Sequence, residues 1–338
     1  MASEKKTILI TGAAGFIGQR LTAALLNKHP EYRLVLTDVV SPKIPSDVQN
    51  AENAVPIQAD LTDPSSLESL IAASQPLSAV FILHGIMSSG SEANPDLSLK
   101  VNLYATRALL LKLGETSTGV RVIYASSQAV YGAPLPDIIT DSVTPTPAGV
   151  YGTHKLMMEI FINDLHRRGV IDAIAVRFPT ISVRAGEPTQ AASSFLSGMI
   201  REPMNGQLCV IPLEDRSYRA VLSGPGTLIE NLLKVLELPS DALPPHIRWL
   251  NFPGISVSVQ ELLDALAKVG GQDRLKYIKE EADPVTERIL RSWPVRVDDS
   301  TAISLGLKRD ENAESLVREY VESMGAQSVV TRTQQGIV

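Results

Sequence analysis

The segment TILITGAAGFIG, residues 7–18, carries the strongest structural signal in this 338-residue chain. Its β-branched run TILIT predicts a buried strand, and residues 16–28 have the pattern of a helix. Glycines at positions 12, 15 and 18 let the joining loop turn sharply and approach a pyrophosphate closely, while the start of the helix offers free N–H groups to an anion. A glycine turn without a ligand is the alternative explanation of this motif when it stands alone.

Strands and helices alternate from this loop onward. Further apolar strands are predicted at 33–37, 54–59, 79–83, 120–125 and 172–178, and helices at 95–113, at 151–168 and from an Asp-Pro start at 63–64. Continuous apolar strands between helices are typical of a parallel sheet that is covered on both faces. We therefore expect an α/β fold built on a doubly wound, parallel Rossmann sheet.

The alternation of strands and helices ends after residue 178. Residues 180–225 show little periodicity, and helical patterns return near 226–236 and 259–269. We expect a cofactor-binding Rossmann domain over 1–178, with a returning segment near 210–240, and a smaller, irregular α/β substrate lobe over 179–325. Residues 326–338 are polar without an apolar pattern, and they predict a loose tail.

The composition excludes several classes of protein. A net charge of −6 and a pI near 5.5, without a cluster of lysines and arginines, argue against nucleic acid as a partner. We expect no membrane span and no signal peptide, because no apolar run is long enough and the first residues are charged. The single cysteine, Cys209, suits a reducing compartment and predicts a cytoplasmic protein. The five histidines lack the spacing of metal ligands, so no metal site is expected.

Asp38 lies twenty residues beyond Gly18, at the end of the second predicted strand. A carboxylate at this place accepts hydrogen bonds from ribose hydroxyls and repels a 2′-phosphate. Val39 and Val40 follow, so no arginine is present to hold that phosphate, and NAD is favoured over NADP. Capping of a turn is the alternative role for Asp38. Asp60, after the third strand, either faces the adenine edge or is an ordinary loop residue.

Tyr151 and Lys155 are four residues apart and therefore lie on one face of a helix. A nearby ammonium and a cationic nicotinamide ring both favour the phenolate, which makes a tyrosine a usable base. Ser127 follows the fifth strand, at the edge where a parallel sheet presents its ligands. Its hydroxyl is expected to hold the reacting oxygen while Tyr151 takes the proton and the cofactor takes hydride. Turn serines beside a surface tyrosine–lysine pair are the alternative.

The segments TGAAGFIG (11–18), SSQAVYG (126–132) and YGTHK (151–155) resemble the extended short-chain dehydrogenase/reductase superfamily of NAD-dependent epimerases and dehydratases. The resemblance covers the whole first domain and implies Ser127, Tyr151 and Lys155 as catalytic residues. It implies that Asn102 is a buried helix asparagine that braces the active-site backbone, with helix packing as the alternative. The cofactor contacts assigned on this basis are Gly12, Gly15, Phe16, Ile17, Gly18, Asp38, Asp60, Leu61, His84, Asn102, Tyr151, Lys155 and Pro179.

Segments 88–102, 151–169, 177–207 and 292–300 show a narrower resemblance, to the D-erythronate dehydrogenase group. It implies the oxidation of a four-carbon sugar acid with NAD, in which the fork of Arg184 binds the carboxylate. An inter-lobe salt bridge is the alternative role for Arg184. The substrate contacts assigned in this way are Ser88, Ser89, Ser127, Thr180 and Arg184.

Two places depart from the pattern of the family. His84 and Gly85 stand where paired alanines are usual, so His84 either caps the fourth strand or adjusts the cofactor pocket. Residues 215–221 are also rebuilt relative to the family.

An NAD-dependent dehydrogenase of a small hydroxy or sugar acid is the leading hypothesis. A nucleotide-sugar epimerase or dehydratase with tightly bound NAD is the alternative, with Arg216, Tyr218 and Arg219 as its candidate contacts. A catalytically inactive NAD-sensing regulator is a remote alternative, because such a protein is expected to lose the tyrosine or the lysine. The apolar surface of the 95–113 helix is too wide for one buried stripe. Together with the superfamily resemblance, it predicts a homodimer.

Overall fold

The computed structural model describes residues 5–186 and 191–334. Its larger part is a seven-stranded parallel sheet in the order β10-β6-β5-β4-β1-β2-β3. The strands are β1 (Lys6–Thr11), β2 (Tyr32–Asp38), β3 (Ala54–Gln58), β4 (Leu77–Ile82), β5 (Arg121–Ser127), β6 (Asp172–Phe178) and β10 (Trp249–Asn251). Six of these seven strands lie where the apolar runs predict them.

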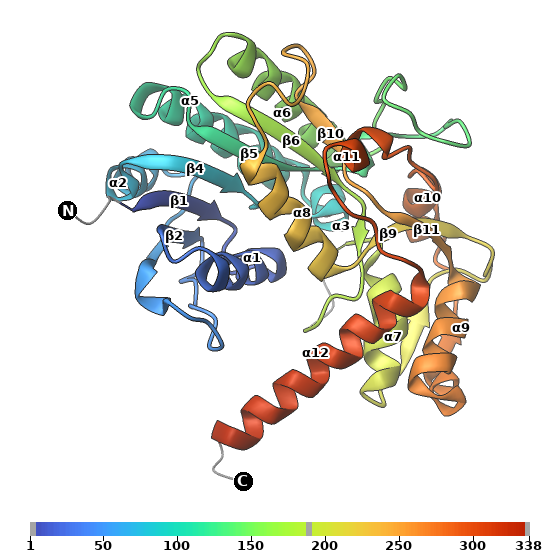
Figure 1. Ribbon diagram of the computed structural model, residues 1–338. Coiled ribbons are helices and arrows are strands. Elements are labelled where there is room, and N and C mark those ends of the chain that lie inside the picture. The colour runs from blue at the N-terminus through green and yellow to red at the C-terminus, as the bar shows by residue number, and fades with distance from the viewer. Residues whose placement is uncertain (1–4, 187–190, 335–338) are drawn as a thin grey trace.

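Helices cover both faces of this sheet (Figure 1). Along β1, Ile8 and Ile10 pack on one face and Leu9 on the other, because successive side chains of a strand point to opposite sides. One face carries α1 (Phe16–Lys28) and α8 (Pro225–Glu237); the other carries α2 (Pro64–Ser74), α5 (Thr106–Thr116) and α6 (Val150–Arg167). The prediction of a doubly wound α/β fold is confirmed.

The helix predicted at 95–113 is not regular throughout. It consists of α4 (Pro95–Ser98), a π-helical segment (Leu99–Ala105) and α5. The wide turn carries Asn102, whose amide accepts a hydrogen bond from the backbone N–H of Ile86 at 2.7 Å and donates to its carbonyl at 3.0 Å. Periodicity does not reveal such an inserted residue, because the apolar pattern continues on both sides of it.

The chain returns to the sheet through α8 and β10, which together span 225–251. This return overlaps only part of the segment predicted at 210–240, because β8 (Cys209–Ile211) and β9 (Arg219–Ser223) belong to the smaller lobe. The strand β10 has only three residues, too few for a pattern to show in the sequence. It extends the sheet by pairing with β6.

The smaller lobe combines two short sheets with helices. One sheet contains β7 (Thr180–Ile181), β9 and β11 (Ile255–Ser258), and the other pairs β8 with β12 (Ile278–Glu280). Around them lie α7 (Ser194–Met204), α9 (Val259–Gly270), α10 (Pro284–Arg291) and α12 (Ala313–Gln334). The remaining short helices are α3 (Ser88–Ala93), α11 (Ser300–Ser304) and the 3₁₀ segments Ala51–Asn53, Gln128–Val130 and Gln272–Tyr277.

The segment predicted as a loose tail begins at residue 326, within the last helix. Helix α12 continues to Gln334, and residues 335–338 lie outside the described part of the chain. Its first half packs through the buried side chains of Leu316, Val317 and Tyr320, and no proline follows to end the helix.

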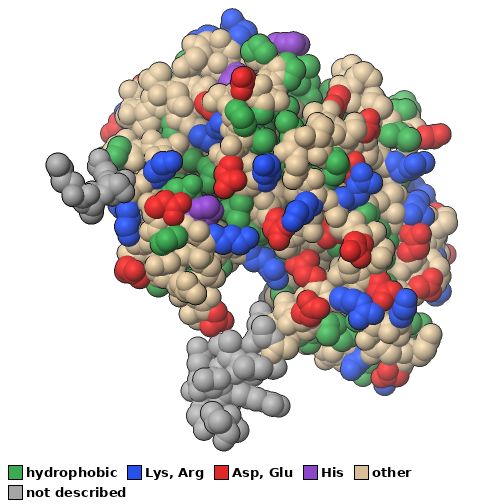
Figure 2. All heavy atoms as spheres, viewed as in Figure 1, with side chains coloured by type: hydrophobic (Ala, Val, Ile, Leu, Met, Phe, Trp, Pro, Cys, Tyr) green, Lys and Arg blue, Asp and Glu red, His purple; other side chains and the backbone are tan. Residues whose placement is uncertain are grey.

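Acidic and basic side chains are interspersed on the surface seen in Figure 2, rather than gathered into regions of one sign. Among the helices at 5–186 and 191–334, none combines the length and the apolar character needed to cross a membrane.

Candidate active site

A cavity of about 700 Å³ lies at the carboxyl end of the parallel strands, between the sheet and the smaller lobe. Its wall includes the ends of β2 and β5 at Asp38 and Ser127, and Val221 of β9 on the opposite side. This is where open α/β sheets bind their ligands, because loops diverge there from neighbouring strands.

Most of the predicted site residues line this cavity. They are Gly12, Gly15, Phe16, Ile17, Gly18, Asp38, Asp60, Leu61, His84, Ser88, Ser127, Tyr151, Lys155, Pro179, Thr180 and Arg184. Two others, Ser89 and Asn102, are not part of the lining. Asn102 instead binds the backbone of Ile86 behind the wall, as expected for a residue that braces the active-site backbone.

The glycine loop fits a dinucleotide for steric reasons that the structure shows directly. Gly12 has a φ of +71°, and a Cβ atom there would lie 2.6 Å from the backbone nitrogen of His84. A Cβ at Gly18 would lie 2.3 Å from the carbonyl oxygen of Gly12. The loop is therefore folded tightly onto β4 and leads directly into α1, whose first N–H groups are available to a pyrophosphate.

The two predicted acidic contacts differ in their surroundings. Asp38 Oδ2 accepts a hydrogen bond from the backbone N–H of Ala14 at 3.1 Å, which ties the end of β2 to the glycine loop. Asp60 Oδ1 accepts from the N–H and the hydroxyl of Thr62 at 2.8 and 2.7 Å, and these bonds lower the pKa of Asp60. Asp60 thus caps a turn and also lines the cavity.

His84 joins two elements through its side chain. Its Nδ1 lies 2.8 Å from the hydroxyl of Thr11 in β1, and its Nε2 lies 3.1 Å from the hydroxyl of Thr106 in α5. Burial, reinforced by the charge of Lys155, lowers the pKa of His84 to about 3. The ring is therefore neutral near pH 7 and holds the end of β4 between β1 and α5, while one side of it lines the cavity.

Ser127, Tyr151 and Lys155 meet at the floor of the cavity. Ser127 lies near Tyr151, and its hydroxyl favours the charged form of the phenol. Lys155 Nζ donates to the carbonyl oxygen of Ala125 at 2.6 Å and lies 5.6 Å from the centre of the Tyr151 ring. Two turns of α6 and the last residues of β5 thus bring a hydroxyl, a phenol and an ammonium together.

Burial shifts both ionisable groups toward their neutral forms. It raises the pKa of Tyr151 to about 12, against the opposing effects of the Ser127 hydroxyl and the positive charge of Arg184. It lowers the pKa of Lys155 to about 8, against the opposing charge of Glu159. A further positive charge beside the phenol is needed to make Tyr151 a base near neutral pH.

Arg184 is a partly buried cation that lines the same cavity. Its backbone N–H binds Ser197 Oγ at 3.0 Å, and its carbonyl oxygen accepts from Arg201 Nη1 at 2.9 Å. Within 5–186 and 191–334, no carboxylate forms an ion pair with its guanidinium, whereas Arg201 pairs with Glu202 at 2.5 Å. Burial, followed by the charge of Arg201, lowers the pKa of Arg184. The inter-lobe salt bridge considered as its alternative role is therefore absent from the described part of the chain.

Tyr218 and Trp293 also line the cavity; the sequence predicted Tyr218 only as a contact for the nucleotide-sugar alternative and did not predict Trp293. The Tyr218 hydroxyl donates to the carbonyl oxygen of Leu290 at 3.3 Å, so its ring, rather than its hydroxyl, is presented to the cavity. Both residues come from segments without a periodic pattern. Residues 215–221 differ from the family pattern, whereas residues 292–300 resemble the D-erythronate dehydrogenase group, and these were the signals that the sequence offered for the two segments.

A glycine-cradled dinucleotide site that meets a tyrosine, a lysine and a serine in one cavity defines a nicotinamide-dependent oxidoreductase with a Rossmann fold. The chain belongs to the NAD dependent epimerase/dehydratase family, whose family model matches residues 8–220. The family resemblance and the prediction of NAD as the cofactor are confirmed.

Curated relatives and solved structures agree with this assignment. The chain is 40% identical over 320 residues to D-erythronate dehydrogenase of Haemophilus influenzae, covering 93% of this chain and 98% of that protein. It is 36% identical to D-erythronate dehydrogenase of Cupriavidus necator, covering 94% and 98%. A nucleoside-diphosphate-sugar epimerase structure from Agrobacterium tumefaciens superposes with a TM-score of 0.86 at 32% identity, covering 94% of both chains.

Proposed function

We propose that the protein is an NAD-dependent dehydrogenase that oxidises a secondary alcohol of a small hydroxy acid of the D-erythronate type. The observation that carries the proposal is the partly buried Arg184, which lines the cavity beside Ser127 and Tyr151 without an ion pair in the described part of the chain. A partly desolvated cation without a partner is unfavourable, and a substrate carboxylate would compensate it with two hydrogen bonds. The relatives named D-erythronate dehydrogenase support a four-carbon acid.

Each residue of the floor has a distinct part in this reaction. Bound NAD supplies the hydride acceptor and a positive charge next to the phenol. The Ser127 hydroxyl orients the substrate oxygen, and the Tyr151 phenolate takes the hydroxyl proton at Oη. The Lys155 ammonium, fixed on the carbonyl of Ala125, stabilises that phenolate. Arg184 holds the carboxylate so that the reacting carbon lies above Tyr151.

The nucleotide-sugar alternative has less support in the smaller lobe. Arg216 pairs with Glu280 at 2.5 Å, Arg219 pairs with Glu261 at 3.0 Å, and the Tyr218 hydroxyl is bound to Leu290. The three candidate contacts for a base and a diphosphate are therefore engaged elsewhere. Because this chain is similar to a solved structure described as an epimerase, epimerisation of a nucleotide sugar is one of the activities to be tested.

A spectrophotometric assay tests the proposal by following NADH formation with D-erythronate, with the neutral polyol erythritol and with a UDP-hexose. We expect oxidation of the acid. In Arg184→Gln, the preference for the acid over the polyol should fall about 10- to 100-fold, as for the loss of a charge-assisted hydrogen-bonded pair. Arg219→Gln is the matched control, because this arginine lies outside the cavity wall. Epimerisation of the UDP-hexose without oxidation of any acid would overturn the proposal.

We further propose a homodimer in the cytoplasm. The exposed apolar side chains of Tyr104, Met157 and Ile160 lie on the π-helical segment and α6, two neighbouring elements on one side of the sheet (Figure 1). Exposed apolar side chains on adjacent helices favour association between copies. Light scattering at micromolar concentration should give the mass of a dimer for the wild type and of a monomer for Ile160→Asp. A monomeric wild type contradicts this proposal.

A further inference from the structure

Three side chains of α6 face the last three residues of β5. Lys155 Nζ donates to the Ala125 carbonyl, Glu159 Oε1 accepts from Ser126 Oγ at 2.5 Å, and Tyr151 lies near Ser127, whose hydroxyl opposes the rise in the pKa of Tyr151. Tyr151, Lys155 and Glu159 are spaced by four residues and therefore share one face of the helix. The first two belong to the catalytic floor, whereas the buried Glu159 has no part in the reaction as described so far.

Glu159 is held from the other side by Arg177 of β6. Arg177 Nε lies 3.0 and 3.1 Å from the two carboxylate oxygens, and Nη2 lies 2.6 Å from Oε2. Arg177 stands opposite Ser126 in the register of β5 and β6, and both Arg177 and Glu159 are at most 2% exposed. A bidentate pair with this geometry fixes both the rotation and the height of α6 against the two strands.

The pair is anchored further toward the smaller lobe. Arg177 Nη1 donates to the Tyr131 hydroxyl at 2.6 Å, and that hydroxyl donates to Asn251 Oδ1 at 3.2 Å. Tyr131 follows Ser127 in the loop after β5, and Asn251 ends β10. The network therefore connects every element that carries or supports the floor of the cavity.

Glu159 is also the anion that acts on Lys155. The groups that face the ammonium are neutral His84 from the end of β4, the ring of Tyr124 from β5 at 4.7 Å, and Tyr151 and Glu159 from α6. Arg177 of β6 stands behind Glu159. Burial lowers the pKa of Lys155 and the negative charge of Glu159 opposes that shift.

We propose that Glu159 is a positioning residue of the reaction: its carboxylate, oriented by Arg177, aligns Tyr151 with Ser127 and keeps the Lys155 side chain charged during turnover. The inference rests on the proposed function, because it assigns a role within that reaction. According to this proposal, Glu159 does not contact the substrate but determines the pH above which activity falls.

The test is the pH dependence of kcat/KM for the acid in Glu159→Gln, which keeps the shape of the side chain and removes its charge. Activity requires Lys155 to be protonated, and loss of the anion lowers the pKa of Lys155 further. The falling alkaline limb should therefore move to lower pH by about one unit, kcat should fall, and KM should change little. In Glu159→Asp the alkaline fall of kcat/KM should return to its wild-type pH, because the negative charge is present again. The kcat should stay low, because the shorter aspartate side chain cannot make the same contacts. The control is Asp164→Asn on the exposed face of α6.

A buried arginine left without its partner can unfold the protein, so a second variant is required. Glu159→Gln with Arg177→Met removes both charges, and its limb should move in the same direction by a smaller amount, because loss of the Arg177 cation partly offsets loss of the Glu159 anion. A limb at the wild-type position in either folded variant would overturn the proposal.

A second readout separates this proposal from the assignment of the reaction. NADH binding, followed by fluorescence against pH, should weaken at lower pH in Glu159→Gln than in the wild type, because Lys155 lines the cofactor cavity. If the wild type oxidises no acid, the proposed function fails while this binding experiment still tests Glu159. Coincident binding curves would overturn the role of Glu159 alone.

Discussion

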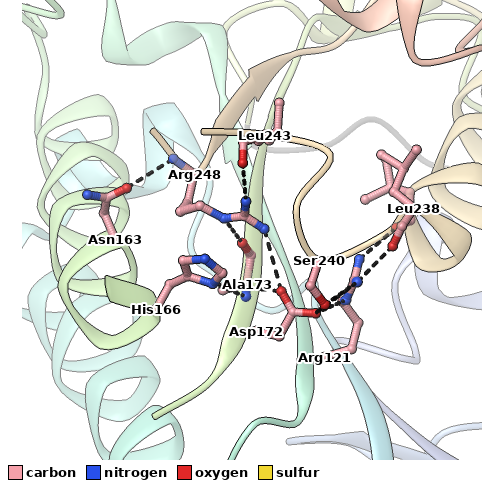
Figure 3. A network of polar contacts seen from close by, with 10 residues as sticks. Arg121, Asn163, His166, Asp172, Ala173, Leu238, Ser240, Leu243 and Arg248 are labelled. Carbon is pink, nitrogen blue, oxygen red and sulfur yellow. Dashed lines mark hydrogen bonds and ion pairs between the residues drawn. The ribbon is translucent and has the colours of Figure 1, made fainter. Parts of the chain in front are cut away.

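Strands β5 and β6 have buried charges at both ends, and the two ends use them differently. At the amino end, Asp172 accepts from Arg121 at 2.9 Å and from Ser240 at 2.6 Å, and lies 3.5 Å from Arg248 (Figure 3). Arg248 also donates to the carbonyls of Ala173 and Leu243, at 2.8 and 3.0 Å. These charges and backbone groups satisfy one another, and they fasten the connection between α8 and β10 to the sheet.

At the carboxyl end, Glu159 and Arg177 also satisfy each other, but Lys155 and the nearby Arg184 line a cavity. Arg184 has no ion pair in the described part of the chain, and Lys155 has a backbone carbonyl and the more distant Glu159 as its partners. Charged side chains that are fully paired within the protein stabilise the fold. Charged side chains in a cavity that lack a full set of partners can bind a ligand instead. We therefore expect substitutions of cavity residues at the carboxyl end to reduce turnover, and substitutions at the amino end to reduce the free energy of unfolding.

The largest effect is expected at the carboxyl end, for Tyr151→Phe. The variant keeps the ring and loses the group that accepts the substrate proton, so turnover should fall by about 10²–10⁴-fold, as for the loss of a general base. NADH affinity and the midpoint of urea unfolding should stay close to those of the wild type. Retention of more than about a tenth of wild-type turnover would contradict the role of Tyr151.

At the amino end, Asp172→Asn should act on stability instead. It leaves Arg121 and the fully buried Arg248 without their carboxylate, and such broken pairs cost about 3–5 kcal/mol. Urea unfolding should show this loss, while kcat at 25 °C stays near the wild-type value. Asp164→Asn, which disrupts exposed pairs with Arg167 and Arg168, is the control and should cost about 0–1 kcal/mol. A selective loss of kcat in Asp172→Asn would mean that the two ends are not independent.

A smaller effect is expected for cofactor choice. In Asp38→Ala with Val39→Arg, the ribose acceptor is replaced by a potential partner for a 2′-phosphate. The kcat/KM for NAD should fall about 10- to 100-fold, the equivalent of one charge-assisted hydrogen bond, and the value for NADP should rise. Steady-state kinetics with both cofactors measures the change. Equal wild-type efficiency with NADP would show that Asp38 does not select the cofactor.

The sequence predicted the elements that have a strong local signal. The glycine loop, the Asp38 position and the Tyr151–Lys155 spacing all depend on residues close together in the chain, and all of them line the cavity. The sequence did not reveal the pairing of Glu159 with Arg177, and it predicted Tyr218 only as a contact for the nucleotide-sugar alternative. These contacts join segments far apart in the chain, and each has an ordinary local context.

The smallest effect is expected from His166, at the amino end. Its Nδ1 accepts from the backbone N–H of Ala173 at 3.2 Å, so the ring is bound in its neutral form. Burial and the charges of Arg248 and Arg121 lower the pKa of His166, although Asp172 opposes them. The unfolded chain therefore binds a proton more readily than the folded one, and stability falls as pH drops below about 6.5, the ordinary histidine value, until the folded pKa is passed.

His166→Asn can replace the acceptor without titrating, so it should lose less stability than the wild type between pH 7.5 and pH 5. Urea unfolding at these two pH values measures the difference. The exposed His246→Asn is the control, and its pH dependence should match that of the wild type. Catalysis should be unaffected in both variants, because neither histidine lines the cavity. If the free-energy difference between His166→Asn and the wild type is the same at both pH values, proton binding at His166 does not contribute to the acid sensitivity of this end.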